Sequence, residues 1–316
     1  MNSFLKAAPA FAVWFGRRGE FFSGGMPVSG QSGWLCKDHN KMNSLINSSI
    51  FRSFIWRLGR RLYCWARREA LPSPHANGEY WLLERLIAAA SSREPIFLDI
   101  GANKGNWSER AASLLKQHNI SGHVYAFEPT ASTFAYLSEK FKGSERVSAS
   151  RIALSDQSGE REFFVVGELA GINSLLRIDG ATTESVTTLR LDDFLAKERI
   201  DHVLFVKSDT EGHDLSVLMG ATEALRQGRV DVWQFEYNHR WIGERSILKD
   251  VFDFIADKPY RVGKLYGNGV EVFEQWHPEL ERFFESNYTL IRKGSGFENL
   301  CTPVHFDTRN VLVPSR

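Results

Sequence analysis

Residues 97–107, FLDIGANKGNW, decide the fold of this chain. An apolar run typical of a buried strand ends in Asp99, and a loop with glycines at positions 101 and 105 follows. Gly101 and Gly105 are expected to let the backbone approach a ligand where any Cβ would collide. A strand that runs into such a loop and then into a helix is typical of the ligand-binding edge of a doubly wound α/β sheet.

Strand-like and helix-like segments alternate from this point onward. The expected strands are 95–100, 123–129, 147–155, 203–209 and 230–238, and 161–166 either extends the sheet or forms a side hairpin. Helices are expected at 107–118 and 131–141, and a terminal hairpin across 260–274. This alternation predicts an α/β fold with a mostly parallel sheet and helices on both faces.

The composition is that of an ordinary globular protein. The chain has 316 residues, of which 43% are apolar and 24% are charged. Its three cysteines lie far apart and form no CxxC pair, which argues against a disulfide framework or a zinc site. We therefore expect a reducing compartment, and the cytoplasm in particular.

The charge is unevenly distributed. Residues 1–70 carry a net charge of +8 and the remainder −7. We expect a poorly ordered extension over 1–45, a basic amphipathic helix within 46–75, a catalytic domain over 76–300 and a tail over 301–316. The apolar face of the helix, centred on 51–70, can pack on the domain or on a second subunit, or it can lie on an anionic membrane surface.

Acidic residues follow the next two expected strands. Glu128 ends the second, where it can accept hydrogen bonds from ribose hydroxyls, and Asp156 follows the third, where it can receive an adenine amine. The Gly-x-x-x-Gly spacing of the first loop differs from the GxGxxG of dinucleotide sites. The pattern favours a nucleoside without a diphosphate, and S-adenosylmethionine is the leading candidate.

Together these segments resemble the FkbM-type S-adenosylmethionine-dependent methyltransferases. The resemblance is carried by FLDIGANKG, VYAFEP, IALSDQSGE, the Leu-Asp-Asp-Phe of 191–194, VKSDTEGHDLSVLMGA and VWQFEYN. It implies a Rossmann-like class I methyltransferase with a seven-stranded sheet. It also implies that Asp99, Gly101, Asn103 and Gly105 line the methionine end of the cofactor, that Glu128 binds the ribose and that Asp156 binds the adenine.

Candidate catalytic residues follow the fourth and fifth expected strands. Methyl transfer to a hydroxyl requires alignment of the reacting atoms and removal of the hydroxyl proton. Asp209 and Glu211 are the preferred acids, and His213 and His239 are further candidates for the base. His213 can instead simply begin the helix that follows it.

A divalent ion is a less favoured alternative. Asp209, Glu211 and Glu236 could share Mg²⁺, because oxygen ligands suit this ion, but no sequence spacing is diagnostic for it. Plain carboxylates without a metal are the competing interpretation.

The acceptor is predicted to be a hydroxyl, in particular that of a saccharide. Six C-terminal aromatic residues can form a sugar platform, although about half are expected in the core: Trp233, Tyr237, Trp241, Tyr260, Tyr266 and Trp276. A non-sugar natural product, a nicotinamide dehydrogenase and a cofactor-binding module without catalysis are the alternatives. A homo-oligomer stays open, whereas nucleic acid is disfavoured because the catalytic part is acidic.

Overall fold

The computed structural model describes residues 48–69, 73–90, 94–167, 174–175 and 179–315. The chain divides into two units, Met1–Gly59 and Arg60–Arg316. The extension expected over residues 1–45 lies outside the described residues. The helix predicted at 51–70 is confirmed as α2 (Ser49–Ala66), which includes the boundary between the units. Among the described residues, no helix is long and apolar enough to cross a membrane.

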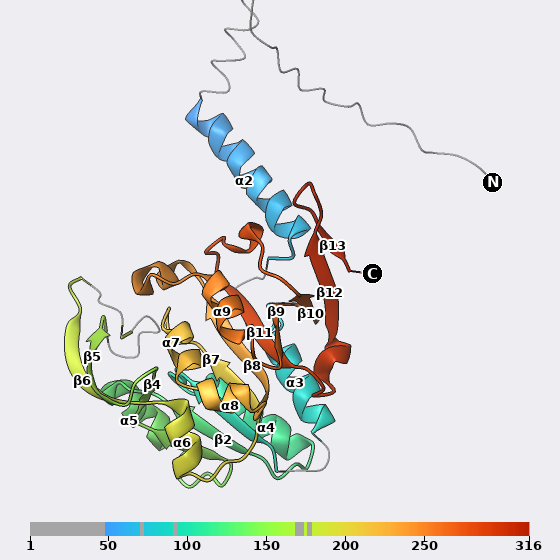
Figure 1. Cartoon of the computed structure of the whole chain (residues 1–316). Helices are drawn as coiled ribbons and strands as arrows, with labels where there is room; N and C mark the ends of the chain where they lie inside the picture. Colours follow the sequence, from blue (N-terminus) through green and yellow to red (C-terminus); the bar gives the residue numbers. More distant parts are fainter. Residues whose placement is uncertain (1–47, 70–72, 91–93, 168–173, 176–178, 316) are drawn as a thin grey trace, which may run out of the picture. The chain divides into compact units, whose positions relative to one another are not determined.

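The second unit is built around a large sheet (Figure 1). In the described residues it has ten strands, in the order β13-β12-β10-β9-β11-β8-β7-β1-β2-β3. The bounds are β1 (Ile96–Ile100), β2 (His123–Phe127), β3 (Val147–Ser150), β7 (Val203–Ser208), β8 (Val230–Tyr237), β9 (Tyr260–Tyr266), β10 (Gly269–Phe273), β11 (Ser286–Arg292), β12 (Cys301–Phe306) and β13 (Leu312–Pro314).

The parallel half of the sheet has its switch point beside β1. Strand β1 pairs in parallel with β2 on one side and with β7 on the other, and β3 and β8 continue the two directions. The chain thus adds β2 and β3 on one side of β1, and then adds β7 and β8 on the other side. The carboxyl ends of β1, β2, β7 and β8 therefore surround one crevice, where ligands bind in such sheets.

The other half departs from the prediction of seven strands in a mostly parallel sheet. Strand β11 lies antiparallel between β8 and β9, and the expected hairpin across 260–274 is confirmed as β9 and β10. The predicted tail over 301–316 instead contributes β12 and β13. These short edge strands bury few side chains, so their sequence lacks the apolar run that marks the central strands.

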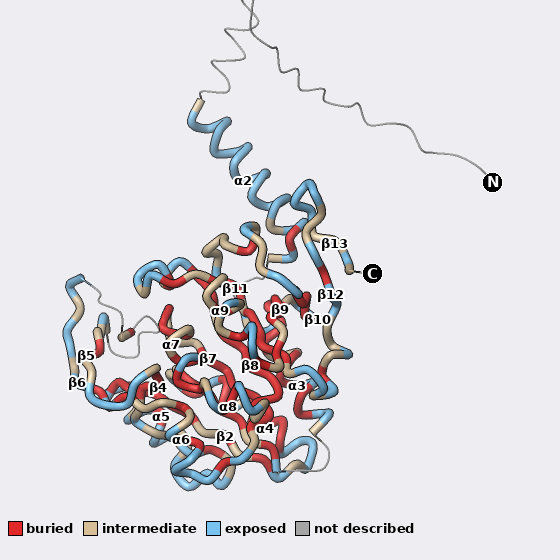
Figure 2. Tube along the Cα trace, in the orientation of Figure 1, coloured by how far each residue is buried: buried red, intermediate tan, exposed pale blue. Residues whose placement is uncertain are grey.

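Helices cover both faces of the sheet. The helices are α3 (Glu79–Ala89), α4 (Asn106–Gln117), α5 (Ala131–Lys140), α6 (Leu191–Lys197), α7 (Asp214–Met219), α8 (Thr222–Arg226) and α9 (Leu248–Ile255), with 3₁₀ turns η1 (His239–Glu244), η2 (Pro278–Leu280) and η3 (Phe297–Leu300). Apolar side chains of α3, α4 and α5 share one core with Phe97 and Phe205, and those of α6 to α9 share another with Leu98 and Val206. The buried segments in Figure 2 follow the central strands between these layers.

The strand expected at 147–155 is divided. Its first part is β3, whereas β4 (Ala153–Leu154) pairs in a second sheet with β6 (Thr182–Leu189) and, through β6, with β5 (Gly159–Val165). Of the two arrangements expected for 161–166, the side hairpin is therefore confirmed. Its inward residues, including Phe163 and Val186, form a small core of their own.

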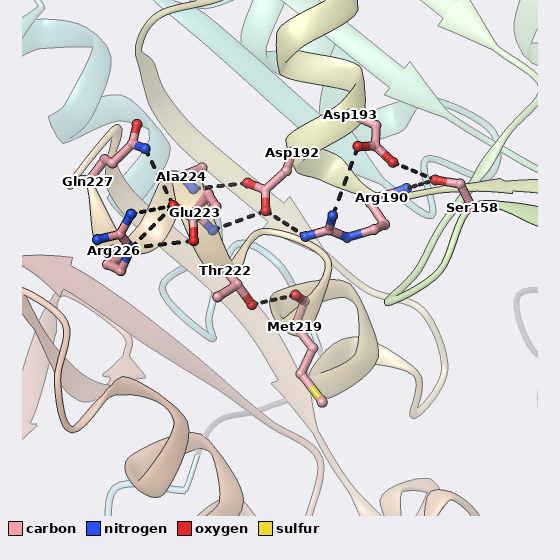
Figure 3. A network of polar contacts seen from close by, with 10 residues as sticks. All are labelled: Ser158, Arg190, Asp192, Asp193, Met219, Thr222, Glu223, Ala224, Arg226 and Gln227. Carbon is pink, nitrogen blue, oxygen red and sulfur yellow. Dashed lines mark hydrogen bonds and ion pairs between the residues drawn. The ribbon is translucent and has the colours of Figure 1, made fainter.

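A polar network centred on Asp192 joins this hairpin to the helical layer (Figure 3). The Asp192 carboxylate accepts hydrogen bonds from the backbone N–H groups of Glu223 and Ala224, at 3.0 and 2.9 Å, and from the Arg190 guanidinium at 2.9 Å. The first two are otherwise unsatisfied donors at the start of α8. Asp192 therefore caps a second helix while belonging to α6.

We predict that Asp192→Ala lowers the free energy of unfolding by about 0.5–2 kcal/mol, because two backbone N–H donors at the start of α8 lose their acceptor. Urea denaturation of the full chain measures this. Asp193→Ala, next to it but more exposed, should cost less than half as much, because its partner Ser158 is at the surface. Equal losses for the two variants would contradict the role given to Asp192.

Candidate active site

A cavity of about 550 Å³ opens at the carboxyl ends of the central strands. Its walls come from the start of α3, the loop after β1, the end of β2, the second sheet, the loop after β7 and the ends of β8 and β11. The lining residues that bear on the chemistry are Glu79, Tyr80, Gly101, Asn103, Trp107, Glu128, Phe163, Lys207, Asp209, Glu211, His213, Glu236, Glu285 and Asn287.

The loop after β1 is held by its two neighbouring strands. The N–H groups of Gly101 and Ala102 both donate to the carbonyl of Phe127, and the N–H of Asp209 donates to the carbonyl of Ile100. Gly101 has φ +78°, and a Cβ there would stand 2.1 Å from the Asp209 carbonyl oxygen. Only glycine fits this position, because the loop touches the β7 loop there.

Gly105 has a different role from the one predicted. It does not line the cavity, and a Cβ there would stand 2.6 Å from Leu137 and from Phe141. Its φ of +69° also favours glycine. Gly105 is therefore required for packing the start of α4 against α5.

Glu128 lines the cavity at the end of β2, as predicted. One carboxylate oxygen accepts from the N–H and the hydroxyl of Thr130, at 3.0 and 2.6 Å, and the other accepts from the N–H of Asn103 at 3.1 Å. Burial raises the pKa of Glu128, and these hydrogen bonds oppose the rise. Because a carboxylate offers about four acceptor positions, roughly one is left for a ligand hydroxyl.

The floor of the cavity contains a buried ammonium group among carboxylates. The Lys207 Nζ atom lies 3.2 Å from Asp209 and 3.9 Å from Asp99. Burial lowers the pKa of Lys207, but Asp209, Glu79 and Asp99 more than reverse this, so the side chain is charged. Asp99 also accepts a 2.6 Å hydrogen bond from Ser108 and does not line the cavity. Asp99 therefore links the end of β1 to Ser108 of α4, behind the residues that line the cavity.

Two further predicted residues lie away from the cavity lining. Asp156 accepts hydrogen bonds from the Ser155 hydroxyl and the Arg161 guanidinium. Its neighbours Ala153 and Leu154, in contrast, line the cavity. His239 is exposed at the first position of η1. The structure therefore does not bring Asp156 or His239 together with the other candidates.

His213 lines the cavity, but both of its ring nitrogens are engaged. Nε2 lies 2.9 Å from the Ser155 hydroxyl, and Nδ1 lies 2.9 Å from the Glu244 carboxylate. The side chain is almost completely buried immediately before α7. This arrangement leaves no ring nitrogen for a substrate, so it favours the structural alternative for His213.

The remaining acids lie close enough together to raise one another's pKa. Burial and then Asp209 raise the pKa of Glu211 to about 7, against the effect of its ion-pair partner Arg240. Burial, followed by Asp209 and Glu211, raises the pKa of Glu236 to about 9. At neutral pH Glu236 is therefore a hydrogen-bond donor, whereas Glu211 is divided between its two forms.

These acids give no support to the Mg²⁺ alternative. Within the described residues, no group of three or more His, Cys, Asp or Glu is arranged to hold a metal ion. Glu211 is paired with Arg240, and Asp209 with Lys207. The carboxylates that would be ligands thus already have cationic partners.

Several lining residues were not found from the sequence. Glu79 stands in the first turn of α3 and accepts a 3.2 Å hydrogen bond from Gln234, a buried residue of β8. Glu285 and Asn287 reach the cavity because β11 runs antiparallel to β8, so that the start of β11 lies beside the end of β8. An acid in the first turn of a helix after a Pro/Gly break was the available signal for Glu79.

The expected aromatic sugar platform is mostly core. Trp233, Tyr237, Trp241 and Tyr260 are buried, and none of the six predicted aromatic residues lines the cavity. The aromatic side chains that do line it are Tyr80, Trp107 and Phe163. Central strands and the helices on them bury large side chains for packing, which explains this difference.

The cavity fits a sulfonium nucleoside. Ile152, Leu154, Phe163 and Leu175 form an apolar wall suited to a flat base, and Glu128 is placed for a ribose hydroxyl. The acidic residues Glu79, Asp209 and Glu211 also line the cavity, where a carboxylate complements a sulfonium or an ammonium group. Lys207 offsets part of the negative charge of these acids.

Comparison with known sequences gives matches in one family. The family described as Methyltransferase FkbM domain matches residues 99–262. The 2-O-methyltransferase NoeI of Sinorhizobium fredii is 24% identical over 198 residues, which are 55% of this chain and 79% of that protein. The hexuronic acid methyltransferase AglP of Haloferax volcanii is 28% identical over 143 residues, 45% of this chain and only 56% of that protein.

Among solved structures, the O-methyltransferase from Bacillus cereus in complex with SAH is similar, with a TM-score of 0.38 and 13% identity. The match covers 82% of this chain and 97% of that one. A SAM dependent methyltransferase from Aquifex aeolicus gives a TM-score of 0.35 with 14% identity, covering 72% and 95%.

We predict that Glu128→Ala weakens the binding of S-adenosylhomocysteine by about 10–100-fold, the loss expected for a hydrogen bond to a charged group. Isothermal titration calorimetry measures this. Asp156→Asn, which changes a residue outside the cavity lining, should stay within about twofold of the wild type. A larger loss of affinity in Asp156→Asn than in Glu128→Ala would instead support the predicted contact of Asp156 with adenine.

A second prediction concerns pH. Glu236 has an ordinary pKa of 4.5, raised to about 9 on folding. The folded state therefore binds the proton more tightly than the unfolded state, and stability is lost as the pH rises from about 4.5 through about 9. Differential scanning calorimetry at about pH 6 and about pH 9 should show a smaller fall in Tm for Glu236→Gln than for the wild type. The exposed control Glu139→Gln should keep the wild-type fall, and an unchanged fall in Glu236→Gln would disprove the assignment.

Proposed function

The chain belongs to the FkbM methyltransferase family, and from this premise we propose that it transfers a methyl group from S-adenosylmethionine to a hydroxyl of a saccharide. The observation that carries the proposal is the cavity at the carboxyl ends of β1, β2, β7 and β8, whose lining combines Glu128 and the Gly101 loop with further acidic residues. The name of AglP, a hexuronic acid methyltransferase, supports a sugar acceptor, and the name of NoeI, a 2-O-methyltransferase, supports transfer to an oxygen.

The charge of the cavity favours a hydroxyl over a carboxylate as the acceptor. Glu211, Glu236 and Glu285 line the part of the cavity formed by the β7 loop and the ends of β8 and β11. An acceptor carboxylate placed there would lie beside the ionised form of Glu211, which would repel it. A neutral saccharide hydroxyl can instead donate to Glu211 and accept from protonated Glu236.

Glu211 is the residue that we assign as general base. It lines the cavity, and its pKa of about 7 means that an appreciable fraction is ionised and able to take a proton near neutral pH. Arg240 forms an ion pair with it and fixes its orientation. Its φ of +57° places it on a tight loop directly after β7.

The other residues bind and orient. When bound, the cofactor supplies an electrophilic methyl group. Glu128 and the loop after β1 would hold the nucleoside, and Asp209, which contacts the Lys207 ammonium, would lie beside the cationic end of the cofactor. Asn287 and Ser286, at the start of β11, are placed to hydrogen-bond the acceptor. Together these residues would hold an acceptor oxygen in line with the reacting carbon.

The proposal is tested by incubating the full chain with S-adenosylmethionine and three acceptor sets: neutral oligosaccharides, uronic acids and polyphenols. We expect mass spectrometry to show methylation in the neutral saccharides, and nuclear magnetic resonance to place the new methyl group on an oxygen. Transfer to the polyphenols alone would replace the saccharide by a non-sugar natural product. Cofactor binding without transfer to any set would favour a binding module.

We predict that Glu211→Gln lowers kcat by about 10²–10⁴-fold, the usual contribution of a general base, and leaves the affinity for S-adenosylhomocysteine within about twofold. In the wild type, kcat should rise with pH and reach half its maximum near 7, because the ionised form is active. His239→Ala is the matched control and should keep wild-type turnover. A Glu211→Gln variant with wild-type turnover and pH profile would exclude Glu211 as the base.

A further inference from the structure

Helix α2 presents large apolar side chains to solvent. None of its residues is buried. In the second unit, Leu62 is 55% exposed and Trp65 is 83% exposed. The other exposed apolar residues of the helix that share their side, by the 3.6-residue repeat, are Phe51, Phe54, Ile55 and Leu58. An apolar stripe of this kind normally packs on a core, and here the described residues leave it uncovered.

The last residues of α2, from Arg60 onward, belong to the second unit and contact it through another side of the helix. The Tyr63 ring meets Phe284 edge-on at 6.4 Å, and the Arg60 guanidinium lies 5.2 Å from the Phe284 ring centre. Arg282 lies 5.5 Å from the Tyr63 ring centre. Within the second unit, Leu62 and Trp65 therefore stay exposed while Arg60 and Tyr63 make the contacts.

The charge of α2 identifies the kind of partner. The helix contains four arginines, at positions 52, 57, 60 and 61, and no acidic residue. The ion pairs found among the described residues do not include Arg52, Arg57 or Arg61. Arginines beside an apolar stripe with an exposed tryptophan complement a surface that has anionic groups above an apolar layer. A second copy of α2 would bring like charges together.

We propose that α2 lies flat on an anionic lipid surface. The apolar stripe would enter the boundary between headgroups and acyl chains, and the arginines would contact lipid phosphates. Because Arg60 and Tyr63 contact Phe284, the catalytic unit would be held beside this surface. The proposal does not depend on which acceptor the enzyme methylates.

The test is co-sedimentation of the full chain with vesicles of phosphatidylcholine, with or without phosphatidylglycerol. We expect binding to the anionic vesicles that weakens as salt is added, and little binding to phosphatidylcholine alone. Leu62→Glu/Trp65→Glu should weaken binding at least about tenfold, because both side chains lose their apolar contact with the lipid. Arg52→Gln/Arg57→Gln/Arg61→Gln should weaken it and reduce its salt dependence.

The matched control is Met219→Glu/Val311→Glu, which makes the same changes at exposed apolar residues outside α2 and should bind as the wild type does. Circular dichroism should give the same Tm for all variants of α2, since no buried residue is changed. Absent binding to anionic vesicles, or equal binding to both vesicle types at all salt concentrations, would overturn the proposal. The proposal would also be overturned if the full chain did not bind vesicles and light scattering showed a dimer that Leu62→Glu/Trp65→Glu dissociates.

Discussion

The buried ammonium of Lys207 is the charge on which the floor of the cavity depends. In the register of the sheet, Lys207 of β7 stands beside Asp99 of β1 on one side and beside Gln234 of β8 on the other. A row of polar side chains therefore crosses three strands on one face of the sheet. Glu79 reaches the same row from α3 through Gln234. Without the cation, carboxylates from β1, the β7 loop and α3 would repel one another in a buried place.

This row also explains why the catalytic site extends beyond the part of the chain that matches the family, residues 99–262. Glu79 lies before that part, and Glu285 and Asn287 lie after it. They reach the cavity because α3 packs on the same face of the sheet and because β11 is inserted beside β8. The matching segment supplies the Gly101 loop and Glu128, and the elements outside it supply Glu79, Glu285 and Asn287.

The sequence predicted the central parallel strands and the acids at their ends because both depend on local patterns. A buried strand is an apolar run, and a residue directly after it lies at the edge of the sheet, as Gly101, Glu128 and Asp209 do. The antiparallel insertion of β11 is set by pairing between distant segments, which no local pattern records. The partners of His213, Ser155 and Glu244, are likewise distant from it in the sequence, so no local pattern showed that both ring nitrogens are engaged. Asp156 is bonded to its near neighbours Ser155 and Arg161, and its contact with adenine stays a prediction.

A crystal structure of the full chain soaked with S-adenosylhomocysteine tests the central claim most directly. We predict density for the nucleoside between the Gly101 loop and Phe163, with a ribose hydroxyl within hydrogen-bond distance of Glu128 and the amino-acid end above Lys207. Density at another place, or a cavity that stays empty at a saturating concentration, would contradict it.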